Sequence, residues 1–179
     1  MLKQVYNYGI NNINHSGGTV MNQLKLSKWL KAIIIGAGIC GTVIYFYIFP
    51  FWGKDIVASN PEFSSYYWIW LLFLWITSMP CYATLVCSLK IADEIGKDNS
   101  FCRKNANLLK LISILASSDS LFFFTGNIIL LLLNMNHPGI VLLSFFVVFA
   151  GIAITVIAAS LSHLVYKAAQ IREENELTI

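Results

Sequence analysis

The residue with the clearest capacity for chemistry is an aspartate that interrupts a long apolar stretch. Asp119 lies in the run Ala-Ser-Ser-Asp-Ser at residues 116–120, nine residues after Lys110. On a helix, this spacing would place its carboxylate about 13 Å inside a membrane. Inserting an acid at such a depth costs about 2.5–3.5 kcal/mol, so we expect Asp119 to face the interior of a helix bundle or water.

Two roles are open for this carboxylate. It can be a proton or cation site, as coupled transport requires, or a polar contact that holds helices together. We favour the structural role, and we note that no Lys, Arg or His lies at the same depth to act as a counter-ion. The groups expected near Asp119 are hydroxyls at a similar depth, namely those of Tyr82, Thr84, Ser117, Ser118 and Ser120.

The elements that must position Asp119 are four apolar stretches, at residues 32–51, 66–89, 111–133 and 139–166. Each has about the 20 residues that a helix needs to cross the roughly 30 Å hydrocarbon core of a bilayer. Of the 179 residues, 57% are hydrophobic and only 12% are charged, which is too little charge to cover a soluble domain. The sequence therefore predicts an all-α integral membrane protein with four transmembrane helices in an up-and-down bundle.

The basic residues predict the orientation of this bundle. Of the twelve Lys and Arg residues, only Lys54 lies on the side that faces away from both termini and from the 90–110 connection. The positive-inside rule then places both termini and that connection in the cytoplasm. Because the net charge of +3 follows membrane sidedness, direct binding of nucleic acid is not expected.

The first twenty residues differ from the rest of the chain. Residues 1–20 are rich in Asn and lack helical periodicity, whereas Met21 opens a short basic segment that leads into the first apolar stretch. Gly17-Gly18 can be encoded by a purine-rich sequence of the kind that binds bacterial ribosomes. We therefore predict that translation starts at Met21, that residues 1–20 are a non-native leader, and that residues 21–179 form the membrane domain. An ordinary disordered tail is the alternative.

The 90–110 connection carries signals for helix ends. Lys90–Ile95 can extend the second helix, with Gly96 as the left-handed residue that stops it. Asn99 or Ser100 can cap the next helix.

This connection and the C-terminal tail also carry features that membrane insertion does not require. The connection offers an aromatic and two basic side chains, and the tail is acidic and then apolar. Segments of opposite charge on the same side of the membrane can pair with each other or bind a third protein. The candidate docking residues are Phe101, Arg103, Lys104 and Asn105 in the connection and Glu173, Glu174, Asn175, Glu176, Leu177, Thr178 and Ile179 in the tail.

Several familiar kinds of site are not expected. The glycines around Gly36 and Gly41 imitate a dinucleotide-binding motif, but the run stays apolar and no alternation of strand and helix follows. The pairs Ala37 with Gly41 and Gly36 with Cys40 instead predict a small-residue face for helix contact. The four cysteines lack CxxC spacing and are interpreted as small apolar fillers. We expect no cofactor, no metal site and no enzymatic activity.

Two motifs resemble the bacterial membrane family known as domain of unknown function 2975. They are Ile95-Gly96 followed by Phe101 and Asn105, and the terminal Glu-Glu-Asn-Glu-Leu-Thr-Ile. The resemblance covers about residues 26–179. It departs at Cys102, where the family often has Ser or Thr, and at Glu176, where it often has Asp; the first departure shifts the expected helix cap to Ser100. The resemblance implies a small four-span protein of the bacterial cytoplasmic membrane, often encoded beside a small helix-turn-helix regulator, with no established activity.

The function that fits these features best is that of a regulatory or adaptor protein. It would bind a cytosolic partner, such as a helix-turn-helix regulator, through the 90–110 connection and the tail. The alternative is a small proton- or cation-coupled transporter that uses Asp119. The partners expected from sequence are thus the lipid bilayer and a cytosolic protein, and a homo-oligomer is left open.

Overall fold

The structure, a computed structural model, describes the backbone of residues 2–177 and the side chains of residues 22–62 and 64–175. Its elements are α1 (Leu2–Val43), η1 (Ile44–Ile48), α2 (Phe49–Ser59), η2 (Pro61–Tyr66), α3 (Tyr67–Gly96), α4 (Arg103–Leu132) and α5 (Pro138–Leu177). Within the described residues, four helical stretches are long and apolar enough to cross a membrane: Asn22–Ser59, Ser64–Gly96, Arg103–Leu132 and Pro138–Asn175. The predicted all-α architecture with four spans is confirmed.

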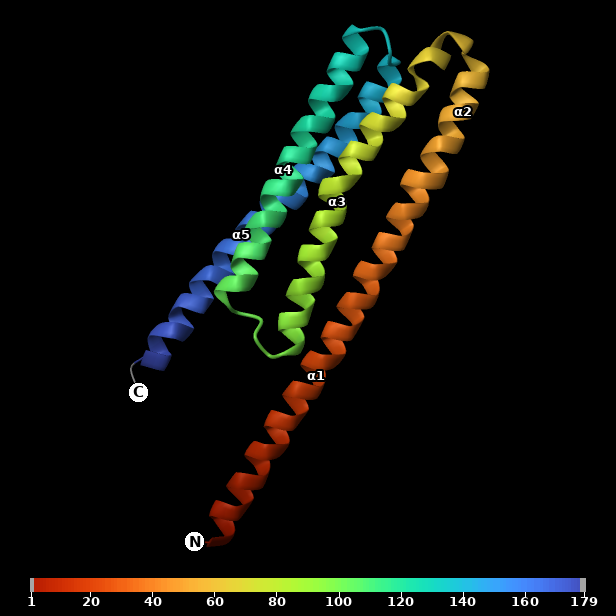
Figure 1. Ribbon diagram of the computed structural model, residues 1–179. Helices are drawn as coiled ribbons and strands as arrows, with labels where there is room; N and C mark the ends of the chain where they lie inside the picture. The colour runs from red at the N-terminus through yellow and green to blue at the C-terminus, as the bar shows by residue number, and fades with distance from the viewer. Residues whose placement is uncertain (1, 178–179) are drawn as a thin grey trace.

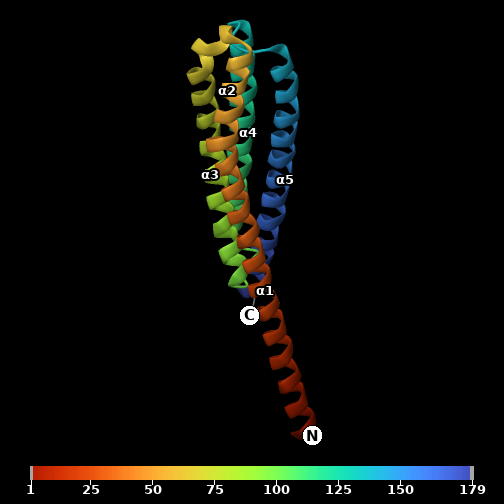
Figure 2. The ribbon, with the colours of Figure 1, turned by 90° about the vertical axis from the view of Figure 1, so that its right-hand side faces the viewer.

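The four spans run alternately up and down (Figure 1). Both ends of the chain and the α3–α4 loop lie at one end of the molecule, which we call the terminal end; the opposite end is the distal end. The helices pack in chain order, because α1 contacts α3, α3 contacts α4 and α4 contacts α5. In Figure 2, α3 and α5 lie on opposite sides of α4. The described backbones of α1 and α5 do not pack on each other.

Most of the large apolar side chains face outward. Trp68, Leu132 and Phe146 are exposed, whereas the buried core is small and includes Ala92, Ala106 and Ala158. Lipid is as apolar as these side chains, so burying them between helices would give little driving force. Close contact between the helices therefore depends on small residues and on hydrogen bonds.

Pro50 does not end the helix of the first span, which continues through α2 to Ser59. Proline has no N–H, and its ring clashes with the carbonyl four residues earlier in a regular helix. The chain responds with the wider turn η1, in which the Phe49 N–H donates to Ile44 O rather than to Tyr45 O. The Tyr45 carbonyl accepts a hydrogen bond from Trp75 Nε1 at 3.3 Å instead. The helix continues into α2 because α3 supplies the missing donor.

The end of α3 differs from the predicted stop at Gly96. Gly96 is the last helical residue, and Asp98 adopts the left-handed conformation, with a φ of 57°. The Asn99 N–H reaches back to Glu94 O at 3.0 Å, which is the bond pattern of a Schellman end. Asn134, with a φ of 55°, ends α4 in the same way. Asp and Asn tolerate this conformation better than most residues do.

Gly96 is required for the packing of α3 against α1 rather than for the turn that ends α3. A Cβ at Gly96 would lie 2.8 Å from Ser27 Oγ, so only glycine lets α1 approach the last turn of α3 this closely. Ser27 Oγ donates a hydrogen bond to Ala92 O at 2.6 Å in the same contact.

The start of α4 also differs from the prediction. Cys102, rather than Asn99 or Ser100, occupies the N-cap position and makes no capping bond with its side chain. Asn99 and Ser100 precede the cap and make other contacts: the Asn99 amide donates to Glu94, and the Ser100 carbonyl accepts from Asn105 Nδ2 at 2.9 Å.

The predicted small-residue face of α1 is correct in part. Gly41 lies against α3, where a Cβ would contact Tyr82 OH at 3.8 Å, and Gly38 similarly faces Leu85. The pair Gly36 and Cys40 points away, because nothing lies within 4 Å of a Cβ at Gly36 and Cys40 is exposed.

Glycines bring α4 much closer to its two neighbours. A Cβ on Gly126 would overlap the ring of Phe73 in α3, and that ring is held by stacking on Phe123 at a centroid distance of 5.8 Å. A Cβ on Gly151 in α5 would overlap Ser120 Oγ. Both contacts require glycine, and neither was predicted.

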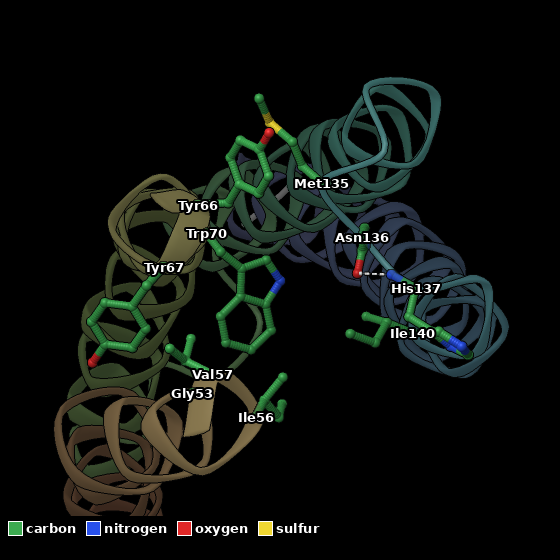
Figure 3. Close-up of a pocket in the computed structure, with 10 residues that line it drawn as sticks. All are labelled: Gly53, Ile56, Val57, Tyr66, Tyr67, Trp70, Met135, Asn136, His137 and Ile140. Atoms are coloured by element: carbon green, nitrogen blue, oxygen red, sulfur yellow. Dashed lines mark hydrogen bonds between the residues drawn. The ribbon is translucent and has the colours of Figure 1, made fainter. Parts of the chain in front are cut away.

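At the distal end, a buried asparagine fixes the turn between α4 and α5. Asn127 is only 2% exposed, and its Oδ1 accepts a hydrogen bond from Asn136 Nδ2 at 3.1 Å. Asn136 Oδ1 in turn accepts from the His137 N–H at 3.0 Å, beside an apolar pocket of about 60 Å³ that Trp70 helps to line (Figure 3). This pocket has room for very few water molecules and not for an organic ligand.

The backbone of α1 begins at Leu2 and therefore includes the segment interpreted as a leader or tail. The side chains of residues 1–21 lie outside the described residues. The start at Met21 stays a prediction.

Candidate functional site

Among the side chains that the structure describes, three ion pairs join the helices at the terminal end, one for each pair of neighbouring spans. The order of these pairs follows the packing order α1–α3, α3–α4 and α4–α5. The pairs are Lys31–Asp93 at 2.5 Å, Lys104–Glu94 at 2.7 Å and Arg103–Glu173 at 2.6 Å.

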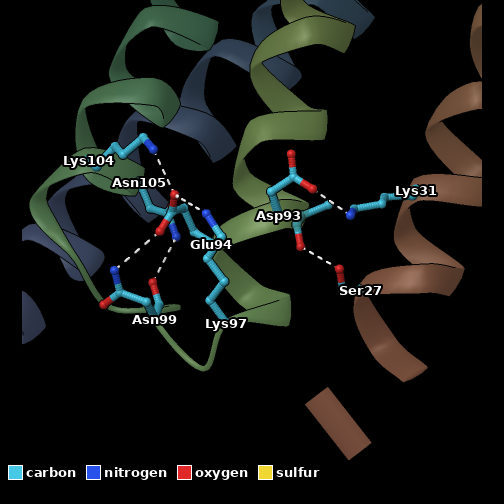
Figure 4. Close-up of polar contacts among 9 residues, drawn as sticks. Ser27, Lys31, Asp93, Glu94, Lys97, Asn99, Lys104 and Asn105 are labelled. Carbon is cyan, nitrogen blue, oxygen red and sulfur yellow. Dashed lines mark hydrogen bonds and ion pairs between the residues drawn. The ribbon is translucent and has the colours of Figure 1, made fainter. Parts of the chain in front are cut away.

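Glu94 is the centre of the largest polar cluster in this group (Figure 4). It is only 7% exposed. Its carboxylate accepts hydrogen bonds from Lys104 at 2.7 Å, from Asn99 at 3.3 Å and from Lys97 at 3.4 Å. An acid in the last turn of a helix faces the negative end of the helix dipole. The three donors offset that repulsion and connect α3 to the start of α4.

These contacts also set the ionisation of the cluster, which lies beyond the apolar part of α3. The hydrogen bond from Lys104, assisted by Asn99, lowers the pKa of Glu94 to about 2. The hydrogen bond from Lys31 likewise lowers the pKa of Asp93. Both carboxylates are therefore negatively charged at neutral pH.

Asn105 is buried rather than available for docking, contrary to the prediction. It is 1% exposed, and its Nδ2 donates to the carbonyls of Ser100 at 2.9 Å and Asn99 at 3.3 Å. Its side chain is used to hold the α3–α4 loop against α4. Its Oδ1 has no hydrogen-bond partner among the described residues.

The two predicted docking segments lie against each other. Arg103 Nη2 lies 2.6 Å from Glu173 Oε2, and the guanidinium is 5.7 Å from the centroid of the Tyr166 ring. Lys104 bonds to Glu94 in α3 rather than to a described residue of the tail, while Phe101 is 57% exposed on the loop.

Most of the remaining tail residues lie on the last turns of α5. Glu174 accepts a hydrogen bond from Gln170 at 3.2 Å, and Asn175 is exposed. The side chains of Glu176 and Leu177, and Thr178 and Ile179 altogether, lie outside the described residues.

Asp119 lies midway along α4, and its partner differs from the hydroxyl groups predicted. Its Oδ2 accepts a weak hydrogen bond from Cys81 Sγ at 3.8 Å, and Cys81 also lies 4.0 Å from Tyr45 OH. Its Oδ1 is buried and has no partner among the described residues. The contact thus links η1, α3 and α4 through a thiol that the sequence analysis interpreted as an apolar filler.

The hydroxyl groups expected around Asp119 bond elsewhere. Hydroxyls on a helix readily bond a carbonyl three or four residues earlier, and this local choice competes with longer contacts. Ser117 is exposed. The other bonds are Tyr82 to Thr42 at 2.8 Å, Thr84 to Pro80 O at 2.9 Å, Ser118 to Leu115 O at 3.0 Å and Ser120 to Ala116 O at 2.7 Å.

Four of the predicted intramembrane residues nevertheless share one cavity. Asp119, Ser120, Tyr82 and Thr84 line a space of about 490 Å³ to which α1, α3, α4 and α5 all contribute. Its other walls are mainly apolar, and none of its lining residues is Lys, Arg, His or Glu. A volume between about 300 and 1,000 Å³ is typical of sites that bind small organic molecules.

Sequence reasoning missed Glu94, Cys81 and Asn127. Glu94 did carry a signal, because an acid in the last turn of a helix requires nearby donors such as Lys97. Cys81 carried none, since a cysteine in an apolar span looks the same as Cys87, which is indeed buried in the core. Among the described residues, no three His, Cys, Asp or Glu side chains lie close enough together to hold a metal ion.

A known protein that resembles this chain is also a membrane protein. The uncharacterized membrane protein YoaS of Bacillus subtilis (strain 168) is 26% identical over 161 residues, which cover 89% of this chain and 100% of the relative. No solved structure matches the chain. Residues 52–179 match a family described as "Protein of unknown function (DUF2975)", a span shorter than the resemblance suggested but still most of the chain. The chain therefore belongs to the DUF2975 family of membrane proteins, whose function is unknown.

Proposed function

We propose that this protein is a membrane-embedded regulatory or adaptor protein that binds a cytosolic protein at its terminal end. The observation that carries the proposal is the contact between Arg103 and Glu173. It joins the α3–α4 loop and the last turns of α5 into one surface. These turns follow the apolar part of α5, which ends near residue 166, so the surface extends beyond the hydrocarbon core.

The chemistry of this surface suits a protein partner. Phe101 is exposed, and the neighbouring Arg103 and Glu173 present charges of both signs. Aromatic and Arg side chains are frequent at the energetic centres of protein interfaces. An exposed ion pair contributes little net stability, since water screens it and both side chains lose freedom. A partner that presents its own Arg or carboxylate can therefore replace either member of the pair.

The distribution of Lys and Arg supports a cytoplasmic location for this surface. For the partner we propose a small helix-turn-helix regulator, the class that the family resemblance implies. Binding to an embedded protein would hold such a regulator at the membrane and limit its access to DNA. This is regulation by location, and it needs no catalytic residue in the membrane protein.

A photo-crosslinking amino acid in place of Phe101 tests the proposal in living cells. We expect it to capture a small DNA-binding protein. The same amino acid in place of Ser59, exposed at the distal end of α2, should capture none. Deletion of residues 173–179 should abolish the crosslink and leave the membrane abundance of the protein unchanged.

The charge-swapped double variant R103E/E173R separates docking from a purely structural contact. It keeps an ion pair between the two segments and reverses the surface that a partner would meet. We expect normal abundance and loss of the crosslink. If the swap leaves crosslinking unchanged, or if the deletion lowers thermal stability in detergent and no DNA-binding protein is captured, the contact is a structural clasp and the proposal is wrong.

A further inference from the structure

The cavity beside Asp119 holds an uncompensated carboxylate. Of the two oxygens, Oδ2 has only the thiol of Cys81 at 3.8 Å, and the buried Oδ1 has no partner among the described residues. A thiol is a weak donor and cannot replace the hydration that an anion loses inside a membrane. In its ionised form, Asp119 therefore lacks one strong donor or one positive charge.

The walls of the cavity define what else an occupant must offer. Leu74, Val148 and Ile154 are among the apolar side chains that line it, and Tyr45 and Phe123 add aromatic rings from two different helices. Aromatic faces attract cations, more strongly when water is excluded. A molecule with an apolar body and one positive charge satisfies the walls and the carboxylate together.

We propose that this cavity binds a hydrophobic organic monocation, with its charged centre at Asp119 and its apolar body between the four spans. The described backbones of α1 and α5 do not pack on each other, so no helix contact closes the cavity between these two spans. Such cations partition into membranes and can enter from the lipid. A lipid acyl chain would cover the same walls but leave the Asp119 oxygen unpaired.

This site is separate from the docking surface at the terminal end, and either proposal can fail without the other. Binding would be the first step of any transport of such cations. It would equally let the concentration of a membrane-soluble cation act on the packing of the four helices. The inference concerns binding alone.

The test uses the whole protein in nanodiscs of zwitterionic phosphatidylcholine, with tetraphenylphosphonium as the probe. Equilibrium dialysis should show saturable binding of about one cation per protein. Tetraphenylborate has nearly the same shape and the opposite charge, and it should show no saturable binding. Asp119→Asn should weaken tetraphenylphosphonium binding about tenfold or more, because it removes the charge and keeps the size of the side chain. Asp55→Asn, an exposed acid that does not line the cavity, should leave binding unchanged.

A second pair of variants tests the cavity without touching the carboxylate. Ala37 lines the cavity and Ala83 does not, although both are exposed on the spans. Ala37→Phe should therefore weaken binding at least as much as Asp119→Asn, and Ala83→Phe should not. The inference is overturned if no saturable binding occurs, if Asp119→Asn binds as tightly as the wild type, or if both phenylalanine variants act alike.

Discussion

Arg103 and Glu173 are separated by 70 positions in the sequence, yet their Nη2 and Oε2 atoms lie 2.6 Å apart at the terminal end. The neighbouring pair, Lys104 and Glu94, joins α4 to α3 as Arg103 joins α4 to α5. The two pairs differ in the burial of their acids: the Glu94 side chain is 9% exposed and that of Glu173 is 48% exposed, whereas Lys104 and Arg103 are exposed at 61% and 54%. Their loss should therefore have different consequences.

Reversing one charge of the exposed pair should have a small effect on stability. We expect Arg103→Glu to lower the melting temperature in detergent by about 2 °C or less, because water screens an exposed pair. The double variant R103E/E173R should regain the wild-type value, and about 0.5 M salt should remove the difference. If Arg103→Glu lowered the melting temperature as much as a Glu94 variant does, the contact with the tail would be essential to the fold.

Replacing Glu94 should cost more, and the cost should depend on pH. Glu94→Gln leaves Lys104 and Lys97 without an anion. The folded pKa of Glu94 is lowered to about 2, against about 4.3 for an unfolded chain. The ionised carboxylate therefore stabilises the fold fully above about pH 5, and this contribution is lost as the pH falls toward 2. Thermal unfolding of the wild type and of Glu94→Gln should show a difference in melting temperature that is constant from about pH 7 to 5 and becomes smaller below about pH 4.

Gly126 and Gly36 form a matched pair for a test of helix packing. Gly126→Ala would press a methyl group into the ring of Phe73, and such overpacking costs about 1–3 kcal/mol. Gly36→Ala meets nothing within 4 Å and should be neutral or stabilising by up to about 1 kcal/mol, the helix preference of Ala over Gly. Unfolding in mixed detergent measures the change in unfolding free energy that each of the two variants causes. Equal effects would contradict the α3–α4 contact.

The hydrogen bond from Trp75 Nε1 to Tyr45 O can be tested together with Pro50, the residue whose missing N–H leaves that carbonyl without a helical donor. Trp75→Phe leaves the Tyr45 carbonyl unpaired in an apolar setting, which costs about 1–3 kcal/mol. In a Pro50→Ala background the chain regains an N–H and can form a regular helix, so the same substitution should cost less. A double-mutant cycle on unfolding free energies gives the coupling. Additive effects would mean that Trp75 stabilises the span by packing alone.

The orientation is tested by reporter fusions. Fusions after Ile95 and Ile179 should report the cytoplasm, and a fusion after Val57 should report the opposite side, as the distribution of Lys and Arg predicts. An external signal at Ile179 together with a cytoplasmic signal at Ile95 would contradict the arrangement of α4 and α5.

The spans could be predicted from the sequence because their formation is a local property. A run of about 20 apolar residues crosses a membrane wherever its neighbours lie, and the helix must satisfy its own backbone bonds there. The position of Asp119 within the third span follows from the same count. Pro50 shows the limit of local reasoning, since the Tyr45 carbonyl in the turn before it is paired by Trp75, a residue of another helix.

Only the tertiary structure decided which faces of the helices meet. The spans are apolar on nearly every side, so no hydrophobic stripe in the sequence marks an inner face. The partner of Asp119, Cys81, and the donors that surround Glu94 depend on how each helix is rotated about its axis. That rotation is set by close contacts such as Gly126 with Phe73 and Gly151 with Ser120, which involve residues far apart in the chain.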